Sequence, residues 1–191
     1  MRAAIYTSYG PPEVLVVKDV EQPYIKDDDR VLISVHSASM NALDYLYRKG
    51  YLPTRLDNGL KKPKNFILGI DVAGTIEAVG KNVQRFKVGE HVFGSCLGSH
   101  SEYVTSRENF LSHKPKNITF EEAAAIPCAG QTALQASRDV AQVNQGQKVL
   151  IYGASGGVGH FAVQLISSSG ADTNSFPFSC KDSINRCSRF I

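Results

Sequence analysis

A glycine-rich turn between an apolar segment and an amphipathic segment is the feature that most constrains the fold of this chain. Lys148–Tyr152 is a short apolar run of the kind found in buried parallel strands. Gly153, Gly156 and Gly159 follow it three residues apart. The next apolar residues have the spacing of one helix face, and they are Val158, Phe161, Ala162 and Leu165. A strand, a bare turn and a helix in this order predict an α/β fold.

The same turn predicts a binding site for a pyrophosphate. Glycine has no side chain, so the main chain can approach an anion closely, and the start of the helix offers N–H groups and a positive dipole. We therefore expect cofactor contacts from the consecutive residues of the turn, which are Gly153, Ala154, Ser155, Gly156, Gly157, Val158 and Gly159. The alternative is a glycine-rich turn that only lets the strand and the helix pack closely.

The residues before this unit have strand patterns. In Arg30–Val35, alternation places Val31, Ile33 and Val35 on one face, which indicates a half-buried strand. From position 69 to position 98, glycines separate short apolar segments at turn-to-turn spacing, as in a small barrel. We predict a β-rich first domain over residues 1–115 and a second domain over residues 116–191, in which 167–191 form an atypical tail.

Helix signals connect the two parts. Thr119–Glu122 forms a capping box ahead of an alanine-rich helix, and Gln131–Val140 continues as a second helical stretch. In the tail, Phe176-Pro177-Phe178 stands where a second parallel strand is needed. Proline cannot donate to a sheet ladder, so this strand is in doubt.

Composition excludes several classes of partner. The net charge is +3, and the one basic cluster, Lys61–Lys64, has no interleaved aromatic residues, so we expect no nucleic-acid binding. No apolar run approaches the ~18 residues of a membrane span, and Met1–Tyr6 begins directly with strand-like sequence rather than a signal or transit peptide. The four cysteines form no CxxC pair, which predicts free thiols and a cytoplasmic location; they are Cys96, Cys128, Cys180 and Cys187.

Several residues around the turn carry a family resemblance: Gly146, Gln147, Leu150, Ala154-Ser155-Gly156-Gly157, Gly159, Gln164 and Ser167. On these residues the chain resembles quinone oxidoreductases of the zeta-crystallin type, which are zinc-independent members of the medium-chain dehydrogenase/reductase superfamily. The resemblance covers residues 1–167 and includes Gly69–Gly74 and Gly89–Gly94. It implies a GroES-like β-barrel domain followed by the first part of a Rossmann dinucleotide-binding domain. Because family members are considerably longer, the chain looks like an N-terminal part.

The resemblance also bears on metal binding. A catalytic zinc needs about three N, S or O ligands and an open position. Zinc-dependent members carry Cys and His where this chain has Asn41 and Ile70, and only Cys128 coincides with a ligand position. The five histidines show no ligand spacing. We therefore expect no metal, so hydride transfer would proceed without a Lewis acid.

Asn41 and Asp44 are the main polar candidates in the first domain. The resemblance implies that Asn41 lies in the substrate cleft, where its amide donates to a substrate carbonyl or fixes the ribose or carboxamide of the cofactor, and that Asp44 orients this group. The alternative is structural, with Asn41 as an N-cap, Asp44 at N3 and Lys49-Gly50 closing a short helix. The two interpretations are compatible, because a cap also fixes a side chain.

Hydroxyl side chains are further candidates. Tyr45, Tyr47 and Tyr51 cluster after Asn41, and a phenol can stack on a quinone or donate a proton to a developing enolate. Tyr51 is preferred, and the alternative is a packed aromatic ring with its hydroxyl at the surface. Thr132 matches a position where family members place a threonine facing the nicotinamide. Its alternative is a hydroxyl bonded to its own helix backbone.

Cofactor choice depends on residues about 20 positions after the glycines, where an acidic residue favours NAD and a basic or serine-rich site favours NADP. The candidates there are Asp172, Ser179, Lys181 and Asp182, and none follows a convincing second strand. NADPH is implied by the resemblance alone, and NADH is left open.

The sequence leaves two alternative functions of different classes open. The first is an NADPH-dependent, zinc-independent oxidoreductase that reduces quinones or α,β-unsaturated carbonyl compounds by direct hydride transfer. The second is a truncated, catalytically inactive remnant that acts at most as a binding or interaction module. The resemblance implies a homodimer for full-length family members, and truncation puts that assembly in doubt here.

Overall fold

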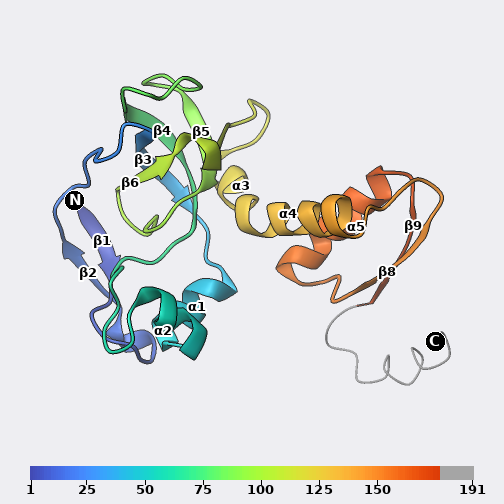
Figure 1. The fold of residues 1–191 in the computed structure, drawn as a ribbon, viewed down its shortest axis with the longest axis horizontal. Coiled ribbons are helices and arrows are strands. Elements are labelled where there is room, and N and C mark those ends of the chain that lie inside the picture. The colour runs from blue at the N-terminus through green and yellow to red at the C-terminus, as the bar shows by residue number, and fades with distance from the viewer. Residues whose placement is uncertain (177–191) are drawn as a thin grey trace. The chain divides into compact units, whose positions relative to one another are not determined.

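The computed structural model describes residues 1–176 of the 191-residue chain (Figure 1). The chain divides into two compact units, Met1–Cys128 and Ala129–Ile191. The first unit is built mainly from antiparallel strands, and the second holds a parallel strand pair with its helix. The predicted α/β fold class is confirmed.

The first unit contains two antiparallel sheets. The smaller sheet pairs β1 (Arg2–Ile5) with β2 (Val16–Asp19). The larger has the order β6-β3-β4-β5-β7, and its strands are β3 (Arg30–Ala38), β4 (Asp71–Val79), β5 (His91–Ser95), β6 (Tyr103–Arg107) and β7 (Leu111–His113). Short 3-10 turns lie at Pro12–Val14 and Glu108–Phe110. The bridges Ala3–Ser101 and Ile5–Ile67 join the small sheet to loops of the large one.

Strand β3 forms as its alternation predicts. Val31 and Ile33 are fully buried, and Val35 packs against the same core cluster. The remaining members of that cluster come from strands β4–β7 and the loop before β5, and they are Val72, Ile76, Phe86, Val92, Val104 and Leu111. At Gly74 a Cβ would lie 2.1 Å from the carbonyl oxygen of Ser34, so only glycine lets β4 approach β3 this closely.

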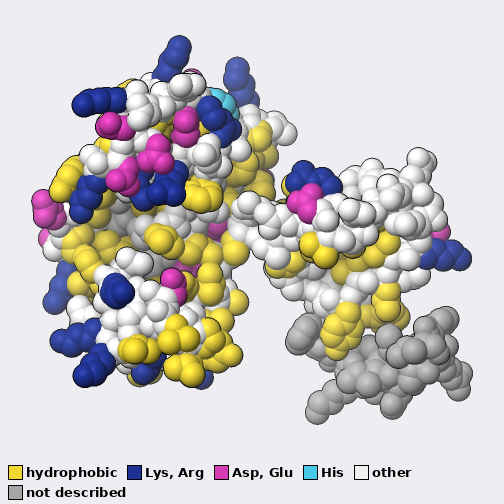
Figure 2. All heavy atoms as spheres, viewed as in Figure 1, with side chains coloured by type: hydrophobic (Ala, Val, Ile, Leu, Met, Phe, Trp, Pro, Cys, Tyr) yellow, Lys and Arg dark blue, Asp and Glu magenta, His cyan; other side chains and the backbone are white. Residues whose placement is uncertain are grey.

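Helices α1 (Ala42–Lys49) and α2 (Leu52–Asn58) have their polar side chains inside. Their buried residues are Asp44, Arg48, Thr54 and Asn58, which recur at i and i+4 along each helix. The apolar residues Leu52 and Leu56 are 65% and 70% exposed. Figure 2 shows hydrophobic side chains on the surface where Figure 1 places these helices. Such an inversion indicates that the buried side makes specific hydrogen bonds rather than an apolar core.

The predicted capping boxes determine where two helices begin. At α3 (Phe120–Ala124), the Thr119 hydroxyl accepts from the N–H of Glu122, and the Glu122 carboxylate accepts from the N–H of Thr119. At α1, Asn41 is the N-cap, and Gly50 closes the helix with φ 73°. Both helix starts are therefore confirmed.

The second unit contains a βαβ unit. Strand β8 (Lys148–Tyr152), helix α5 (Gly157–Ser168) and strand β9 (Asp172–Phe176) follow one another, and the two strands pair in parallel. Ile151, Ile166 and Ala171 form its small core. The predicted helical stretch over Gln131–Val140 is found as the end of α4 (Pro127–Leu134) and a π-helical segment, Gln135–Val140.

Two expectations for this unit are wrong. Strand β8 is parallel as predicted but not buried, because β9 is its one neighbour within residues 1–176 and leaves Leu150 52% and Tyr152 60% exposed. The second strand, which the proline put in doubt, is formed as β9. Its described residues, Asp172–Phe176, all precede the proline and pair with Lys148–Tyr152.

Residues 1–176 contain no helix that has both the length and the apolar character needed to cross a membrane. The same part of the chain holds no group of three or more His, Cys, Asp or Glu side chains arranged to hold a metal ion. Cys96 and Cys128 form no disulfide within residues 1–176, and Cys180 and Cys187 lie outside the described residues.

Candidate functional site

A buried carboxylate organises the polar part of the first unit. Asp71, the first residue of β4, is 1% exposed. Its Oδ2 accepts hydrogen bonds from the Ser39 hydroxyl at 2.8 Å and the Asn41 side-chain amide at 3.0 Å. Its Oδ1 accepts from the backbone N–H of Cys128 at 3.0 Å. Three donors from two segments of the chain, the loop before α1 and the start of α4, therefore converge on one carboxylate.

Asp44 adds a second buried carboxylate beside this network. It is 3% exposed, and its Oδ2 accepts from the backbone N–H of Asn41 at 2.8 Å. Its Oδ1 accepts from the N–H of Gly69 at 2.9 Å. Asp44 therefore ties the start of α1 to the loop before β4.

The Asn41 amide retains hydrogen-bonding capacity. Its nitrogen lies 3.0 Å from both the Ser39 hydroxyl and Asp71 Oδ2, and those two oxygens are only 2.8 Å apart. Both acceptors are thus on the same side of the nitrogen, and one N–H can serve both. The second N–H of Asn41 is left for a ligand, while its side-chain oxygen faces the backbone N–H of Asp44 in the capping box of α1. The capping and ligand-binding interpretations are therefore compatible in this geometry.

Burial sets the protonation behaviour of Asp71. Removal from water raises the pKa of this carboxyl above its usual value, and the nearby Asp44 carboxylate adds to the increase. The hydrogen bonds from Asn41, Ser39 and Cys128 act in the opposite direction, because they stabilise the charged form. Neither carboxylate has an ion-pair partner within residues 1–176.

The three tyrosines do not join this network. Tyr51 lies beyond the C-terminal end of α1, whereas Asn41 caps its start, so about 12 Å of helix separates them. Tyr51 and Tyr45 are about half exposed. The hydroxyl of Tyr47 donates to Asp57, and this bond and burial raise the pKa of Tyr47 to about 12. The structure brings Asn41 and Asp44 together and leaves Tyr51 apart.

In the turn of the second unit, the geometry favours glycine for a different reason at each end. Gly153 adopts φ 82°, a left-handed conformation that glycine accommodates without strain. At Gly159 a Cβ would lie 2.1 Å from the carbonyl oxygen of Gly153, so the helix passes too close to the turn for a side chain. A Cβ at Gly157 would meet no atom within 4 Å.

The start of α5 offers unpaired donors. Gly156 is the N-cap, and the first helical bond runs from the N–H of His160 to the carbonyl of Gly156. The amides of the first three helical residues therefore have no partner inside the helix, and Gly156, Gly157 and Gly159 beside them carry no side chain. Bare N–H groups at the positive end of a twelve-residue helix suit an anion such as a pyrophosphate.

Of the remaining candidate residues, the structure describes only Thr132 and Asp172. Thr132 lies on α4 with its side chain exposed. Asp172 is the first residue of β9, at the opposite end of that strand from the glycine turn. Ser179, Lys181 and Asp182 lie outside the described residues, and so does the position that follows the carboxyl end of β9.

Ser39 and Asp71 were not among the predicted site residues. One signal could have identified Asp71, because it is the one charged residue in the otherwise apolar run Ile67–Ala73. An acidic residue inside a segment destined for a sheet core needs donors around it. No pattern pointed to Ser39, since its role depends on the pairing of β3 with β4.

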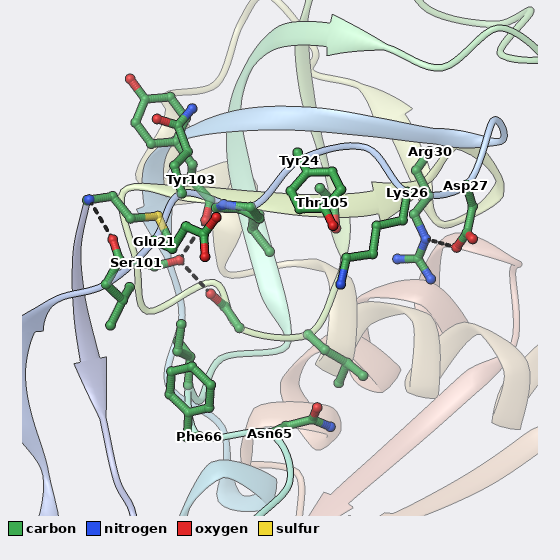
Figure 3. Close-up of a pocket in the computed structure, with 18 of the residues that line it drawn as sticks. Glu21, Tyr24, Lys26, Asp27, Arg30, Asn65, Phe66, Ser101, Tyr103 and Thr105 are labelled. Atoms are coloured by element: carbon green, nitrogen blue, oxygen red, sulfur yellow. Dashed lines mark hydrogen bonds and ion pairs between the residues drawn. The ribbon is translucent and has the colours of Figure 1, made fainter.

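Cavities do not coincide with the predicted site. A cavity of about 570 Å³ in the first unit contains none of the predicted site residues (Figure 3). A second, of about 30 Å³, includes Asp44 and has roughly the volume of a water molecule. The hydrogen-bond network of the first unit and the glycine turn of the second unit, each considered by itself, are therefore the candidate binding features rather than a cavity.

Comparisons with known proteins give the site its context. Residues 27–116 match the family described as the alcohol dehydrogenase GroES-like domain. Human quinone oxidoreductase is 38% identical over 169 residues, covering 86% of this chain and 49% of that protein. A 2-methylene-furan-3-one reductase from Solanum lycopersicum is 35% identical over 176 residues, covering 86% of this chain and 44% of that protein.

A solved structure agrees with these relatives. A mycobacterial protein complexed with NADPH superposes with a TM-score of 0.81 at 27% identity, covering 99% of this chain and 56% of that one. The chain therefore spans about half the length of the curated relatives that it matches.

Proposed function

Since this chain belongs to the medium-chain dehydrogenase/reductase superfamily, we propose that it catalyses the NADPH-dependent, zinc-independent reduction of quinones or α,β-unsaturated carbonyl compounds. The observation that carries the proposal is the glycine turn before α5, where Gly153 adopts a left-handed φ and a Cβ at Gly159 would collide with the Gly153 carbonyl oxygen. The names of the human and tomato relatives supply the class of acceptor.

The turn and the start of α5 would hold the pyrophosphate of the cofactor. The amides of Gly157, Val158 and Gly159 are directed to it by the helix, and the open space at Gly157 fits a bulky anion. When bound, the nicotinamide supplies the hydride. In the zinc-independent reaction that we propose, polar groups of the chain would stabilise the charge that develops on the acceptor oxygen.

Asn41 is the group that we assign to that task. Asp71 and Ser39 fix its amide from one side, and Asp44 fixes its backbone N–H. A donor held in place before the reaction stabilises developing charge without the cost of reorienting. Its second N–H would donate to the acceptor oxygen or the cofactor carboxamide. Tyr51 and Thr132 stay predictions for contacts to the acceptor and the nicotinamide.

A specific observation favours the inactive remnant as the second candidate. Within the described residues β8 pairs only with β9, and Leu150 and Tyr152 of β8 are more than half exposed. An exposed parallel strand edge promotes association with other chains. A binding or interaction module without catalysis is therefore the alternative to test.

One experiment separates the two. Purified chain is titrated with NADPH while the cofactor fluorescence is followed, and NADPH oxidation is then measured with a naphthoquinone as acceptor. The enzyme proposal predicts saturable binding and turnover. A folded sample with neither, and with strong binding of the apolar dye ANS, would establish the remnant instead. Repeating the titration with NADH tests the cofactor preference. Cytoplasmic location stays a prediction, and so does the expectation that truncation puts the homodimer of the full-length family in doubt for this chain.

A further inference from the structure

Helix α2 ends at Asn58, and Gly59 follows it as the C-cap (Figure 1). In the sequence, Asn58 is the one asparagine that precedes a glycine. Such a pair is chemically labile in an unfolded chain, because no side chain keeps the glycine nitrogen away from the asparagine side chain. The glycine nitrogen attacks the side-chain carbonyl carbon, ammonia leaves, and water opens the cyclic imide to aspartate or isoaspartate.

The fold requires both residues of this pair. Asn58 is 1% exposed, and its amide nitrogen donates to Tyr6 Oη at 2.9 Å and to the carbonyl of Asn65 at 3.2 Å. Its side-chain oxygen accepts from the N–H of Asn65 at 2.7 Å. Gly59 has φ 110°, and a Cβ there would lie 2.4 Å from the carbonyl oxygen of Lys62, so no larger residue fits. A labile pair is therefore built into the structure.

The native contacts also hold the reacting groups apart. The N–H of Gly59, whose nitrogen is the nucleophile, donates to the carbonyl of Arg55 at 2.8 Å. The carbonyl of Gly59 accepts from Tyr9 Oη at 2.6 Å, and the Asn58 side chain is held by the bonds described above. Ring closure requires the end of α2 to open. The reaction rate in the folded protein is therefore that of the unfolded chain multiplied by the fraction of open molecules.

The surroundings of Asn58 accept an amide but not a carboxylate. Asn58 lines the cavity of about 30 Å³ together with Asp44 and Asp57, and within the described chain no Lys, Arg or His side chain lines it. An aspartate at position 58 would add a third carboxylate to this wall, removed from water and without a basic partner. It would also lose the donors to Tyr6 and to the carbonyl of Asn65. The reaction product is therefore incompatible with the native packing.

We propose that Asn58 is a latent deamidation site, which the native fold keeps closed and whose reaction traps the first unit outside that fold. When the end of α2 opens, the Gly59 nitrogen displaces ammonia from Asn58, and hydrolysis of the imide leaves a carboxylate where the packing needs an amide. The reaction consumes only water and needs no oxidant, reductant or enzyme. Each opening of α2 thus carries a chance of irreversible loss of native protein.

The test compares the full chain folded in buffer with the same chain unfolded in guanidinium chloride at the same pH and temperature. Peptide mass spectrometry follows the conversion of Asn58 to aspartate or isoaspartate over time. We expect conversion to be at least about tenfold slower in the folded chain, because only open molecules react. Tyr6→Phe removes one hydrogen bond of Asn58 and should speed the reaction of the folded chain about fivefold. Tyr24→Phe, which removes an exposed hydroxyl, is its matched control.

A second pair of variants tests the trap. Asn58→Asp reproduces the product and should abolish the cooperative urea unfolding transition of the first unit, whereas Asn117→Asp makes the same change at an exposed side chain and should keep it. Three results would overturn the proposal: no conversion of Asn58 in guanidinium chloride, equal rates in the folded and unfolded chains, or equal stability of the two aspartate variants. None of these measurements depends on NADPH binding or turnover.

Discussion

The side-chain amide of Asn41 donates to Oδ2 of Asp71 over 3.0 Å, which joins the residue before α1 to the first residue of β4. Sequence reasoning left two roles open for Asn41, a helix cap and a ligand contact. The contact with Asp71 gives it a third role, as a donor to a buried carboxylate. A change at Asn41 should therefore affect both catalysis and stability, and these effects can be separated.

Asn41→Ala should reduce the rate of NADPH-dependent quinone reduction about 100-fold, the usual cost of removing one positioned donor. It should also lower the free energy of unfolding by about 1–3 kcal/mol, because Asp71 loses a donor. Ser39→Ala is the matched control, since it removes a donor to the same oxygen and leaves the ligand-facing N–H. Steady-state kinetics and urea unfolding measure the two effects. If Ser39→Ala lost as much activity as Asn41→Ala, Asn41 would have no direct role.

Asp71 should make stability depend on pH. Its folded-state pKa lies above the usual 3.8, so the folded protein holds this proton more tightly than the unfolded chain does. The contribution of Asp71 to the free energy of unfolding therefore falls as the pH rises from about 4 through the raised pKa. Asp71→Asn removes this contribution. Urea unfolding between pH 4 and pH 7 should show a smaller decline for the variant, and identical slopes would contradict the assignment.

The local features of this fold were predictable because they depend on neighbouring residues. The capping boxes at Thr119 and Asn41 and the helix after the glycine turn each follow from side chains within one or two turns of helix. The alternation in β3 likewise identified its buried face. These features form wherever the local residues permit them.

The errors concern features that depend on distant residues. Burial of β8 requires strands on both sides, and within residues 1–176 only β9 is present, so an apolar sequence alone could not predict its exposure. The Asp71 network joins residues more than 50 positions apart, from Cys128 to Asp71. The inverted helices α1 and α2 bury polar residues because of such contacts, against the usual hydrophobic pattern.

The two cysteines of the first unit should differ in reactivity. Burial raises the pKa of the Cys96 thiol to about 12, so only about one molecule in 10,000 carries the thiolate at pH 8. The pKa of Cys128 is raised as well, chiefly by burial. Alkylation by iodoacetamide at pH 8, followed by peptide mass spectrometry, should label Cys128 before Cys96. Urea should remove the difference, and faster labelling of Cys96 in the folded state would refute the prediction.

Gly157 and Gly159 are two residues apart, and alanine should affect them in opposite ways. Gly159→Ala places a Cβ 2.1 Å from the Gly153 carbonyl and should lower the free energy of unfolding by about 1–3 kcal/mol. Gly157→Ala meets no atom within 4 Å and should leave stability unchanged or raised. If the pyrophosphate occupies that open space, Gly157→Ala will still weaken NADPH binding at least tenfold. Thermal unfolding and fluorescence titration measure both effects, and unaltered NADPH affinity in a stable Gly157→Ala protein would exclude the turn as the cofactor site.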